Sequence, residues 1–412
     1  MQHISSKLIH GKLDNDTADN HRSLKTPIYE TASFDFKNSE EMEDAFKGNS
    51  DAFAYSRISN PTVSELQQRL KVLSGSEDTL CMSSGMAAIS NVFLTLCSSG
   101  DNIITSKYLF GNTFSFFANT LESLGVEARF TDFNNLDDIK RNCNEQTRAI
   151  FMEIPTNPQL ILFDIEKIAE WAEHKNIVLV IDNSILTPYL FQASNYKIDI
   201  ELFSNTKFIS GGATSIGGTI QIFKSEKWKH IPKLRKEYDA YGSRAFYKRL
   251  YKEIYRNMGS CLSPQSAWLQ ILGLETLILR VDKTNENALI VAKHLKEHKK
   301  VTNVHYLSLP CSPYYERTKK YFRGEGGCLI NLNLGNKQSC YDFMDALKMI
   351  RRGTNFCDNK SMIIHPSSTI YWDFKENEKE EMKIDSGMLR LSIGIENVDD
   401  IINDLNQALD KI

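Results

Sequence analysis

The sequence predicts an α/β fold: a large domain built on a mostly parallel sheet, followed by a smaller α+β domain toward the C-terminus. Short apolar runs alternate with stretches in which apolar residues recur every three to four positions. This is the pattern of strands joined by crossover helices. The runs 177–182 and 200–204 are mostly apolar and are followed at once by polar residues. Such runs are typical of parallel strands that are buried on both faces.

Chain length predicts more than one domain, because 412 residues exceed what a single core usually supports. Residues 1–60 lack sustained periodicity and are predicted to form an irregular N-terminal arm. An arm of this length rarely packs only against its own chain. Residues 61–260 are predicted to form the α/β domain, and residues 261–412 the α+β domain.

The elements of the α/β domain follow from periodicity, taken in chain order. Leu66, Leu70 and Leu73 recur at helical spacing, and the helix that they mark ends at Gly75. The expected elements are helix 63–74, strand 78–82, helix 89–97, strand 102–105, helix 114–124, strand 127–130, helix 136–143, strand 148–153, helix 165–175 and the two strands named above.

The character of the chain changes after about residue 225. Residues 227–255 are rich in Lys, Arg and Tyr, which predicts exposed helices. Helices are then expected over 262–279, 286–297 and 398–409. The segments 328–333 and 389–393 mostly alternate apolar and polar residues, which predicts an antiparallel sheet with one exposed face.

Composition and charge argue against several classes of function. A net charge of −3 gives no attraction to nucleic acid or to an anionic membrane. No apolar run approaches the ~20 residues of a membrane-spanning helix, and the N-terminus lacks the pattern of a secretory signal. The eight cysteines show neither Cys-x-x-Cys nor metal-site spacing, so we expect no metal and a reducing compartment, by default the cytoplasm. Among them, Cys357 lies near a candidate substrate site.

Polar residues at the ends of the two apolar runs suit pyridoxal phosphate. The cofactor's aldehyde needs an amine for a Schiff base, its ring nitrogen needs a carboxylate, and its phosphate needs hydroxyl and N–H donors. Lys207 offers the amine, Asp182 the carboxylate, and Ser204 and Thr206 the hydroxyls. A surface lysine and a capping aspartate are the alternative reading of the same residues.

Other segments add candidate ligands, each with a structural alternative. Ser84, Gly85 and Met86 open a predicted helix, whose free N–H groups suit a phosphate or are simply capped. The side chains that complete this set are Tyr55 and Arg57 in the arm, Asn157 after a strand, and Arg390 within an apolar strand. A buried arginine needs an anionic partner, either a ligand or a structural carboxylate.

Taken together, these segments resemble the pyridoxal-phosphate enzymes of cysteine and methionine metabolism, from Thr26 to Glu396. That family includes cystathionine γ-synthase, cystathionine lyases, methionine γ-lyase and O-acetylhomoserine sulfhydrylase. The resemblance implies a fold type I large domain, like that of aspartate aminotransferase. It also implies a homotetramer of close dimers, in which Tyr55 and Arg57 reach the cofactor phosphate of a neighbouring subunit.

Within the family, the sulfhydrylase branch is the most similar. The long loop 207–218 and the segment 354–361 resemble that branch, and Asn355 stands where the lyases have serine. By this resemblance Asn355 and Arg390 bind the α-carboxylate of an amino-acid substrate.

Three departures from the family pattern bear on activity. Phe110 replaces a tyrosine whose ring stacks on the cofactor; it can stack but has no hydroxyl to move protons. Tyr55 or Tyr108 then compensates, or the reaction is slower. Cys357 replaces a glycine, and the pair Ile370-Tyr371 replaces Thr-His.

The expected reaction is γ-replacement on O-acetylhomoserine. Lys207 removes protons, acetate departs, and sulfide or a small thiol takes its place, giving homocysteine or methionine. The alternatives are γ-elimination, cystathionine synthesis or cleavage, and a pseudoenzyme that binds the cofactor without catalysis. A nucleotide site at the glycines of 211–218 lacks the spacing of known phosphate loops. The leaving group and the physiological sulfur donor stay open.

Overall fold

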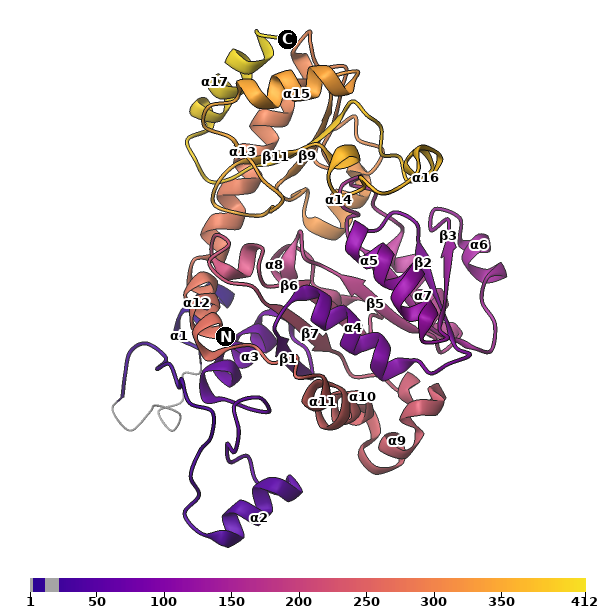
Figure 1. The fold of residues 1–412 in the computed structure, drawn as a ribbon, viewed down its shortest axis with the longest axis vertical. Coiled ribbons are helices and arrows are strands. Elements are labelled where there is room, and N and C mark those ends of the chain that lie inside the picture. The colour runs from indigo at the N-terminus through magenta and orange to yellow at the C-terminus, as the bar shows by residue number, and fades with distance from the viewer. Residues whose placement is uncertain (1–2, 12–21) are drawn as a thin grey trace.

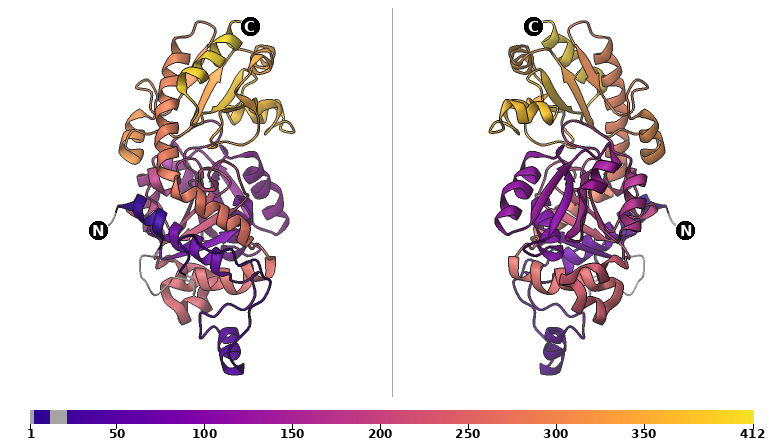
Figure 2. Two further views of the ribbon diagram at one scale, coloured as in Figure 1. Left: turned by 90° about the vertical axis from the view of Figure 1, so that its left-hand side faces the viewer. Right: turned by 90° about the vertical axis from the view of Figure 1, so that its right-hand side faces the viewer.

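The protein's structure is a computed structural model that describes residues 3–11 and 22–412. It contains a seven-stranded sheet and a five-stranded sheet in two layered α/β bodies stacked along the long axis (Figure 1). The side views in Figure 2 show the C-terminal body at one end and the arm projecting beyond the other. The expected α/β class, with a large, mostly parallel sheet and a smaller C-terminal α+β part, is confirmed.

The large sheet has the strand order β1-β7-β6-β5-β4-β2-β3. Neighbours from β6 to β3 run parallel, whereas β7 is antiparallel to both β1 and β6. The crossovers place the carboxyl ends of the parallel strands at one edge, where open α/β sheets bind ligands. The strands are β1 (Asp78–Met82), β2 (Asn102–Ser106), β3 (Glu127–Thr131), β4 (Thr147–Glu153), β5 (Val178–Asp182), β6 (Ile200–Ser204) and β7 (Gly218–Ile222).

Helices surround both sheets, and their caps follow local sequence. The Asn60 side chain caps α3, Pro61 fits its first position, and Gly75 ends it with φ 71°. The helices before the centre of the chain are α1 (Ile4–His10), α2 (Ser39–Lys47), α3 (Pro61–Ser74), α4 (Gly85–Leu96), α5 (Gly111–Ser115), α6 (Leu136–Arg141), α7 (Ile165–His174) and α8 (Thr187–Leu190). Those after it are α9 (Arg235–Tyr241), α10 (Ala245–Arg249), α11 (Arg256–Met258), α12 (Pro264–Glu275), α13 (Leu277–Glu297), α14 (Tyr315–Phe322), α15 (Lys337–Ala346), α16 (Glu376–Glu381) and α17 (Val398–Leu409).

Two separate cores cover the faces of the large sheet. On one face, α3, α7 and α12 bury residues such as Leu70, Ile168 and Ile271. On the other face, α4 and α10 bury Phe93 and Phe246. Because α12 shares the first core, it packs with the large sheet, and the boundary at residue 260 stays a prediction.

The smaller sheet has the order β10-β11-β12-β9-β8 and is buried on both faces at its centre. The expectation of one exposed face is therefore wrong. Apolar residues of β9 and β12 pack under α13 and α17, while the polar residues between them face the large domain: Asn331 donates to the carbonyl oxygen of Pro158, and Arg390 to the side chain of Asn157. The strands are β8 (Asn303–His305), β9 (Leu329–Asn333), β10 (Arg351–Arg352), β11 (Met362–Ile364) and β12 (Met388–Ser392).

The basic, tyrosine-rich segment 227–255 forms helices, but they are not simply exposed. Trp228 and Phe246 are fully buried and stack with ring centroids 5.1 Å apart, and Leu250 and Tyr255 lie in the same core. Lys227 of this segment is buried as well, with its amine 2.8 Å from a carboxylate oxygen of Asp199.

The arm contains two helices that the sequence did not predict, α1 and α2, and part of it, residues 1–2 and 12–21, lies outside the described residues. Figure 1 shows α2 projecting away from the body. It buries none of its residues and leaves Met42 and Phe46 exposed. None of the helices in the described ranges combines the length and the apolar character required to cross a bilayer.

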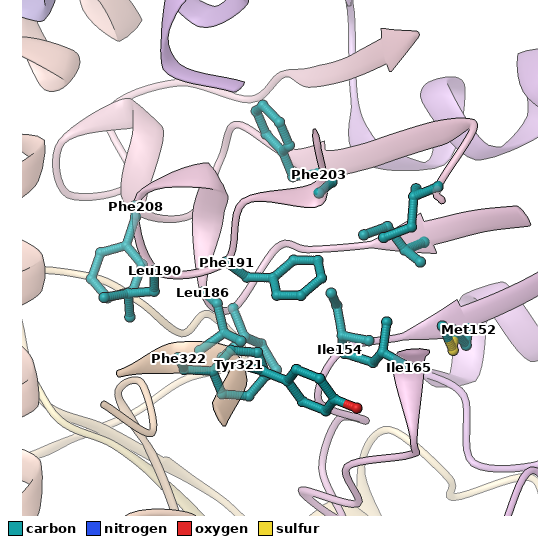
Figure 3. Close-up of a cluster of buried hydrophobic side chains, with 14 of the residues drawn as sticks. Met152, Ile154, Ile165, Leu186, Leu190, Phe191, Phe203, Phe208, Tyr321 and Phe322 are labelled. Atoms are coloured by element: carbon teal, nitrogen blue, oxygen red, sulfur yellow. The ribbon is translucent and has the colours of Figure 1, made fainter. Parts of the chain in front are cut away.

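An aromatic cluster joins the two bodies. Phe322 of α14 packs edge-on against Phe191 at 5.8 Å between ring centroids, and Tyr321 packs against Tyr196 at 5.6 Å. Figure 3 shows these rings of α14 together with Leu186 of the large domain. This contact sets how the smaller sheet lies against the sheet edge that carries the polar residues.

Replacement of Phe322 by alanine tests this junction. The side chain has no exposed surface, so we expect Phe322→Ala to lower the free energy of unfolding by about 3–5 kcal/mol. Leu124→Ala, at a half-exposed position, is the control and should change it by about 0.5 kcal/mol or less. Urea denaturation measures both; equal midpoints for the two variants would contradict the assignment.

Candidate active site

Three polar side chains meet at the carboxyl ends of neighbouring parallel strands. Glu153 ends β4 and is the register partner of Asp182, which ends β5, and Ser204 ends β6. The residue two positions before each of them belongs to the core beneath α4, so all three side chains point to that face of the sheet. The structure thus places Asp182 and Ser204 at the same edge of the sheet, as the sequence predicts.

Ser184 ties two of these residues to each other. Its N–H donates to Oδ1 of Asp182 at 2.9 Å, and its hydroxyl oxygen accepts the N–H of Ser204 at 2.7 Å. Burial raises the pKa of the Asp182 carboxyl, while the hydrogen bonds from Ser184 and the positive charge of Lys207 offset part of the rise. Asp182 is therefore held in place in a setting that favours a cationic partner.

The start of α4 lies directly against the end of β6. Ser84 caps the helix by accepting the N–H of Ala87 at 3.0 Å, and a Cβ on Gly85 would lie 3.0 Å from Cβ of Ser204. A Cβ on Gly218 would lie 2.2 Å from the carbonyl oxygen of Ser84, so only glycine permits this approach. The first N–H groups of α4 have no partner within the helix, and they emerge beside the hydroxyl of Ser204.

Thr206 and Lys207 follow directly after the end of β6. The Thr206 hydroxyl oxygen accepts the N–H of Gly217 at 3.2 Å. Lys207 donates from Nζ to Oδ1 of Asn355 at 2.7 Å, and Nζ lies 4.1 Å from the centroid of the Phe356 ring. Burial, with a contribution from the charge of Arg390, lowers the pKa of Lys207 to about 8. A fraction of the amine is therefore neutral near physiological pH, where an ordinary lysine is almost wholly charged.

Arg390 is the second cation of the cluster. Its guanidinium donates to the side-chain oxygen of Asn157 at 3.0 Å and to the carbonyl oxygens of Thr354 and Asn355 at 3.0 and 3.3 Å. These oxygens are neutral, and Nε is buried without a partner in the described part of the chain. Burial lowers the pKa of Arg390 to about 10, which still leaves it charged at neutral pH. The structural ion pair considered for this residue is not present among the described residues.

Glu153 supports the two loops on the other side of the site. Its carboxylate oxygens accept the N–H of Phe110 at 2.7 Å and of Asn157 at 3.0 Å. Burial and the nearby charge of Asp182 raise the pKa of Glu153 to about 8. Tyr371 closes the same corner, because its hydroxyl donates to the carbonyl oxygen of Leu109 at 2.8 Å.

The structure does not bring every expected residue to this cluster. Tyr55 and Arg57 are exposed, and Arg57 contacts the Tyr55 ring and the carbonyl oxygen of Arg256. Within the described chain, neither residue contacts Lys207. Tyr108 is buried against Phe163, with ring centroids 6.5 Å apart, so its contacts do not support the substitution for Phe110 considered from the sequence.

Sequence reasoning did not single out Glu153 and Phe356, and it noted Tyr371 only as a departure from the family pattern. The signal for Glu153 is present, since a carboxylate that ends an apolar strand is unusual. Phe356 and Tyr371 carry no such signal, because aromatic residues in a loop more often fill a core. Within the described ranges, no three His, Cys, Asp or Glu side chains group as a metal site.

Comparison with known proteins identifies the chain's relatives. The family model for Cys/Met metabolism PLP-dependent enzymes matches residues 5–410. A solved structure from Campylobacter jejuni, assigned as an O-acetylhomoserine (thiol)-lyase and containing a pyridoxyl-lysine phosphate, is 33% identical and covers 99% of this chain and 100% of its own, with a TM-score of 0.94.

Two further relatives have different activities in their names. An O-acetylhomoserine sulfhydrylase structure from Wolinella succinogenes is 41% identical over 85% of this chain and 97% of its own, with a TM-score of 0.76. An L-methionine gamma-lyase from Fusobacterium nucleatum is 32% identical over 95% of this chain and 94% of its own.

The donor groups of the cluster fit pyridoxal phosphate. A desolvated lysine amine, a carboxylate held by Ser184, two hydroxyls and the free N–H groups of a twelve-residue helix match the aldehyde, ring nitrogen and phosphate. The unpartnered Nε of Arg390 fits a further anion, such as the carboxylate of an amino acid.

The lowered pKa of Lys207 can be tested on the cofactor-free protein. A pKa of about 8 leaves about half of the amine neutral at pH 8, whereas an ordinary lysine with a pKa of about 10.4 is almost wholly charged there. Acylation of Lys207, followed by peptide mass spectrometry from pH 6 to 11, should show a midpoint near 8. In Arg390→Gln the loss of a positive charge should move this midpoint upward. A midpoint above 10 in the unmodified protein would contradict the desolvated amine.

Proposed function

Because the chain belongs to the Cys/Met metabolism PLP-dependent enzyme family, we propose that it acts as an O-acetylhomoserine sulfhydrylase. Its cofactor is pyridoxal phosphate, and family membership implies an amino acid and a sulfur compound as substrates. In the proposed reaction, sulfide or methanethiol replaces acetate to give homocysteine or methionine. The observation that carries this choice is Asn355, which takes the place of the lyases' serine and directly contacts Lys207 at 2.7 Å.

We propose that the edge of the large sheet holds the cofactor. Ser84, Gly85 and Met86, with the hydroxyls of Ser204 and Thr206, would bind its phosphate. Asp182 would pair with the ring nitrogen, with Phe110 and Asn157 contacting the ring. When bound, pyridoxal phosphate supplies an electron sink for the charge left on a substrate carbon that loses a proton.

The proton chemistry is assigned to Lys207. A neutral amine is required to take a proton, and burial makes Lys207 neutral at a pH where an exposed lysine is charged. Asn355 orients the amine, and Phe356 lies beneath it, so the proton acceptor has a defined position. Departing acetate is replaced by the sulfur nucleophile, while Lys207 passes protons between substrate carbons.

The substrate carboxylate is assigned to Arg390 and Asn355. Arg390 is charged, has an unused donor and faces the site from the smaller domain. A guanidinium can bind a carboxylate through two N–H groups, which fixes the orientation of the amino acid. The closed corner formed by Glu153 and Tyr371 keeps the loops of Phe110 and Asn157 in place around it.

Two other functions remain as alternatives. γ-Elimination is supported by the similarity to methionine gamma-lyase, which at 32% is as identical to this chain as one O-acetylhomoserine sulfhydrylase is. Cystathionine synthesis or cleavage belongs to the same group of reactions. A pseudoenzyme is favoured only by Phe110, which lacks the hydroxyl of the family's tyrosine.

A homotetramer with a crossing arm accounts for the position of Tyr55 and Arg57, and we propose this assembly. The arm leaves both residues exposed and carries further uncovered apolar side chains, Met42 and Phe46 among them. A neighbouring subunit would bury these side chains and receive the arginine at its cofactor phosphate. Tyr55 would then lie beside the cofactor, where its hydroxyl can take part in proton transfer.

An assay of the purified holoenzyme with O-acetylhomoserine and sulfide tests the function. We expect homocysteine and a change in cofactor absorbance on substrate addition, and neither product nor change with Lys207→Ala. Arg390→Lys should raise KM by about tenfold to a hundredfold, because the two-point contact with the carboxylate is lost. Release of 2-oxobutanoate and ammonia without sulfide would instead favour the lyase. Bound cofactor with no product from either substrate set, restored by Phe110→Tyr, would overturn the proposed activity.

Arg57→Ala tests the crossing arm. Losing a charge-assisted contact to phosphate costs about 1.5–3 kcal/mol, so cofactor should dissociate about ten to a hundred times more readily. Cofactor absorbance after dialysis and the mass from analytical ultracentrifugation give the two readouts, and both should fall. Arg141→Ala, at an exposed arginine on α6, is the control and should change neither. Unchanged values for Arg57→Ala would argue against an arm that crosses between subunits.

A further inference from the structure

Two buried cysteines lie in contact beside the Lys207 cluster, and the proposed reaction gives neither of them a part. Cys328 directly precedes β9, and Cys357 follows Phe356 in the loop that carries Asn355. Their Sγ atoms are 2.9 Å apart, and neither residue has any exposed surface. Both thiols are free.

The surrounding contacts hold the two thiols against each other. Cys357 has φ 54°, in the left-handed region that glycine favours, and its N–H donates to the Ser392 hydroxyl oxygen at 3.0 Å. The Ser392 hydroxyl in turn donates to Sγ of Cys328 at 3.7 Å. A non-glycine residue in this backbone conformation persists where its surroundings hold it, and here they hold its thiol against Cys328.

The two sulfurs are chemically distinct. Burial alone raises the pKa of Cys328, but hydrogen bonds from Cys357 and Ser392 and the charge of Arg390 outweigh it, so the pKa lies below its usual value. Burial and the neighbouring Cys328 sulfur raise the pKa of Cys357 well above its usual value. Cys328 is therefore the more acidic of the two thiols and the one more readily converted to a nucleophilic thiolate, whereas Cys357 holds its proton more firmly.

We propose that Cys328 and Cys357 are an oxidation site that reacts with a peroxide and closes to a disulfide that disables the active site. The Cys328 thiolate attacks one peroxide oxygen, the O–O bond breaks, and a sulfenic acid and hydroxide form. The sulfur of Cys357 then attacks the sulfenic sulfur, forming the S–S bond and expelling the second oxygen as hydroxide. The Cys357 proton and one solvent proton convert the two hydroxides to water. The two sulfurs lose two electrons in total, and the peroxide gains them.

Closure acts on the site through Phe356. The Sγ atoms must approach to about 2.05 Å, which moves Cys357 and the adjoining residue toward β9. The Phe356 ring lies 4.1 Å from Nζ of Lys207 and 5.1 Å from Cζ of Arg390. The groups proposed to take the proton and the substrate carboxylate are therefore displaced together.

The experiment treats the holoenzyme with hydrogen peroxide, removes the excess with catalase, and divides the sample. One part is denatured, alkylated and digested without reductant for mass spectrometry; the other is assayed before and after dithiothreitol. We expect a Cys328–Cys357 linked peptide with two fewer hydrogens. Activity should fall about a hundredfold, the effect of a misplacement on the order of 1 Å, and return with reductant.

Three variants make the result specific. Cys357→Gly suits the left-handed backbone and should keep its activity through the peroxide treatment, as should Cys328→Ala. Cys340→Ala removes another buried thiol, whose Sγ contacts the carbonyl oxygen of Gly387, and should respond as the unmodified enzyme does. If Cys357→Gly fails to fold, Cys328→Ala carries the comparison.

The possible outcomes distinguish failure of this inference from failure of the proposed function. Only the activity measurement of this experiment rests on the proposed function. Cys328 and Cys357 recovered as free thiols after treatment that oxidises the exposed Cys311 would overturn the oxidation site. A linked peptide without loss of activity, or equal loss in Cys357→Gly, would overturn the switch. If the enzyme proves to be a lyase, the same peptide and the same reversible loss of lyase activity would support the site, while the sulfhydrylase assignment alone fails.

Discussion

Lys207 and Arg390 lie over the same phenyl ring, and no carboxylate neutralises Arg390 among the described residues. Burying a charge without a counter-ion is unfavourable, and the enclosure shifts both pKa values downward. Lys207 can therefore lose its proton near pH 8, whereas Arg390 stays charged there. The same enclosure thus places a readily deprotonated amine beside a charged guanidinium. In the proposed function, the carboxylate of an amino-acid substrate would neutralise the remaining charge, so that substrate binding would also stabilise the site.

The fold meets this constraint by bringing two sheets together. Parallel strands deliver Asp182 and Ser204 to one edge, and β12 delivers Arg390 from the smaller sheet. Neither sheet alone forms the cluster, so the junction around Phe191 and Phe322 helps to fix the distance between Lys207 and Arg390. A shift of the smaller domain would move Arg390 relative to Lys207 without altering the local backbone around either residue.

Local chemistry explains how much of this could be predicted. Lys207 and Asp182 end apolar runs, so their edge position follows from the rule for parallel sheets, and Asn60 marks the start of α3 in the same local way. The alternation around Arg390 was misread, because a polar residue facing a site and one facing solvent give the same period of two. The contact of Cys328 with Cys357 joins positions far apart in the chain, and no local pattern encodes it.

The departures at residues 110 and 371 are also distant in sequence, yet they meet in one corner. Phe110 has no hydroxyl, and the Tyr371 hydroxyl donates to the carbonyl oxygen of the residue before it, Leu109. Burial and the nearby Glu153 hold the pKa of Tyr371 far above its usual value, so its proton stays on the oxygen. Tyr371 can therefore restore a hydrogen bond to this loop but not the proton transfer that a phenol at position 110 would offer. In this corner, Lys207 and Glu153 both have a pKa of about 8, and Glu153 is engaged by two backbone N–H groups. In the proposed reaction, proton movement within one subunit would therefore fall to Lys207, and an arm crossing from a neighbouring subunit would bring Tyr55 as a second proton carrier.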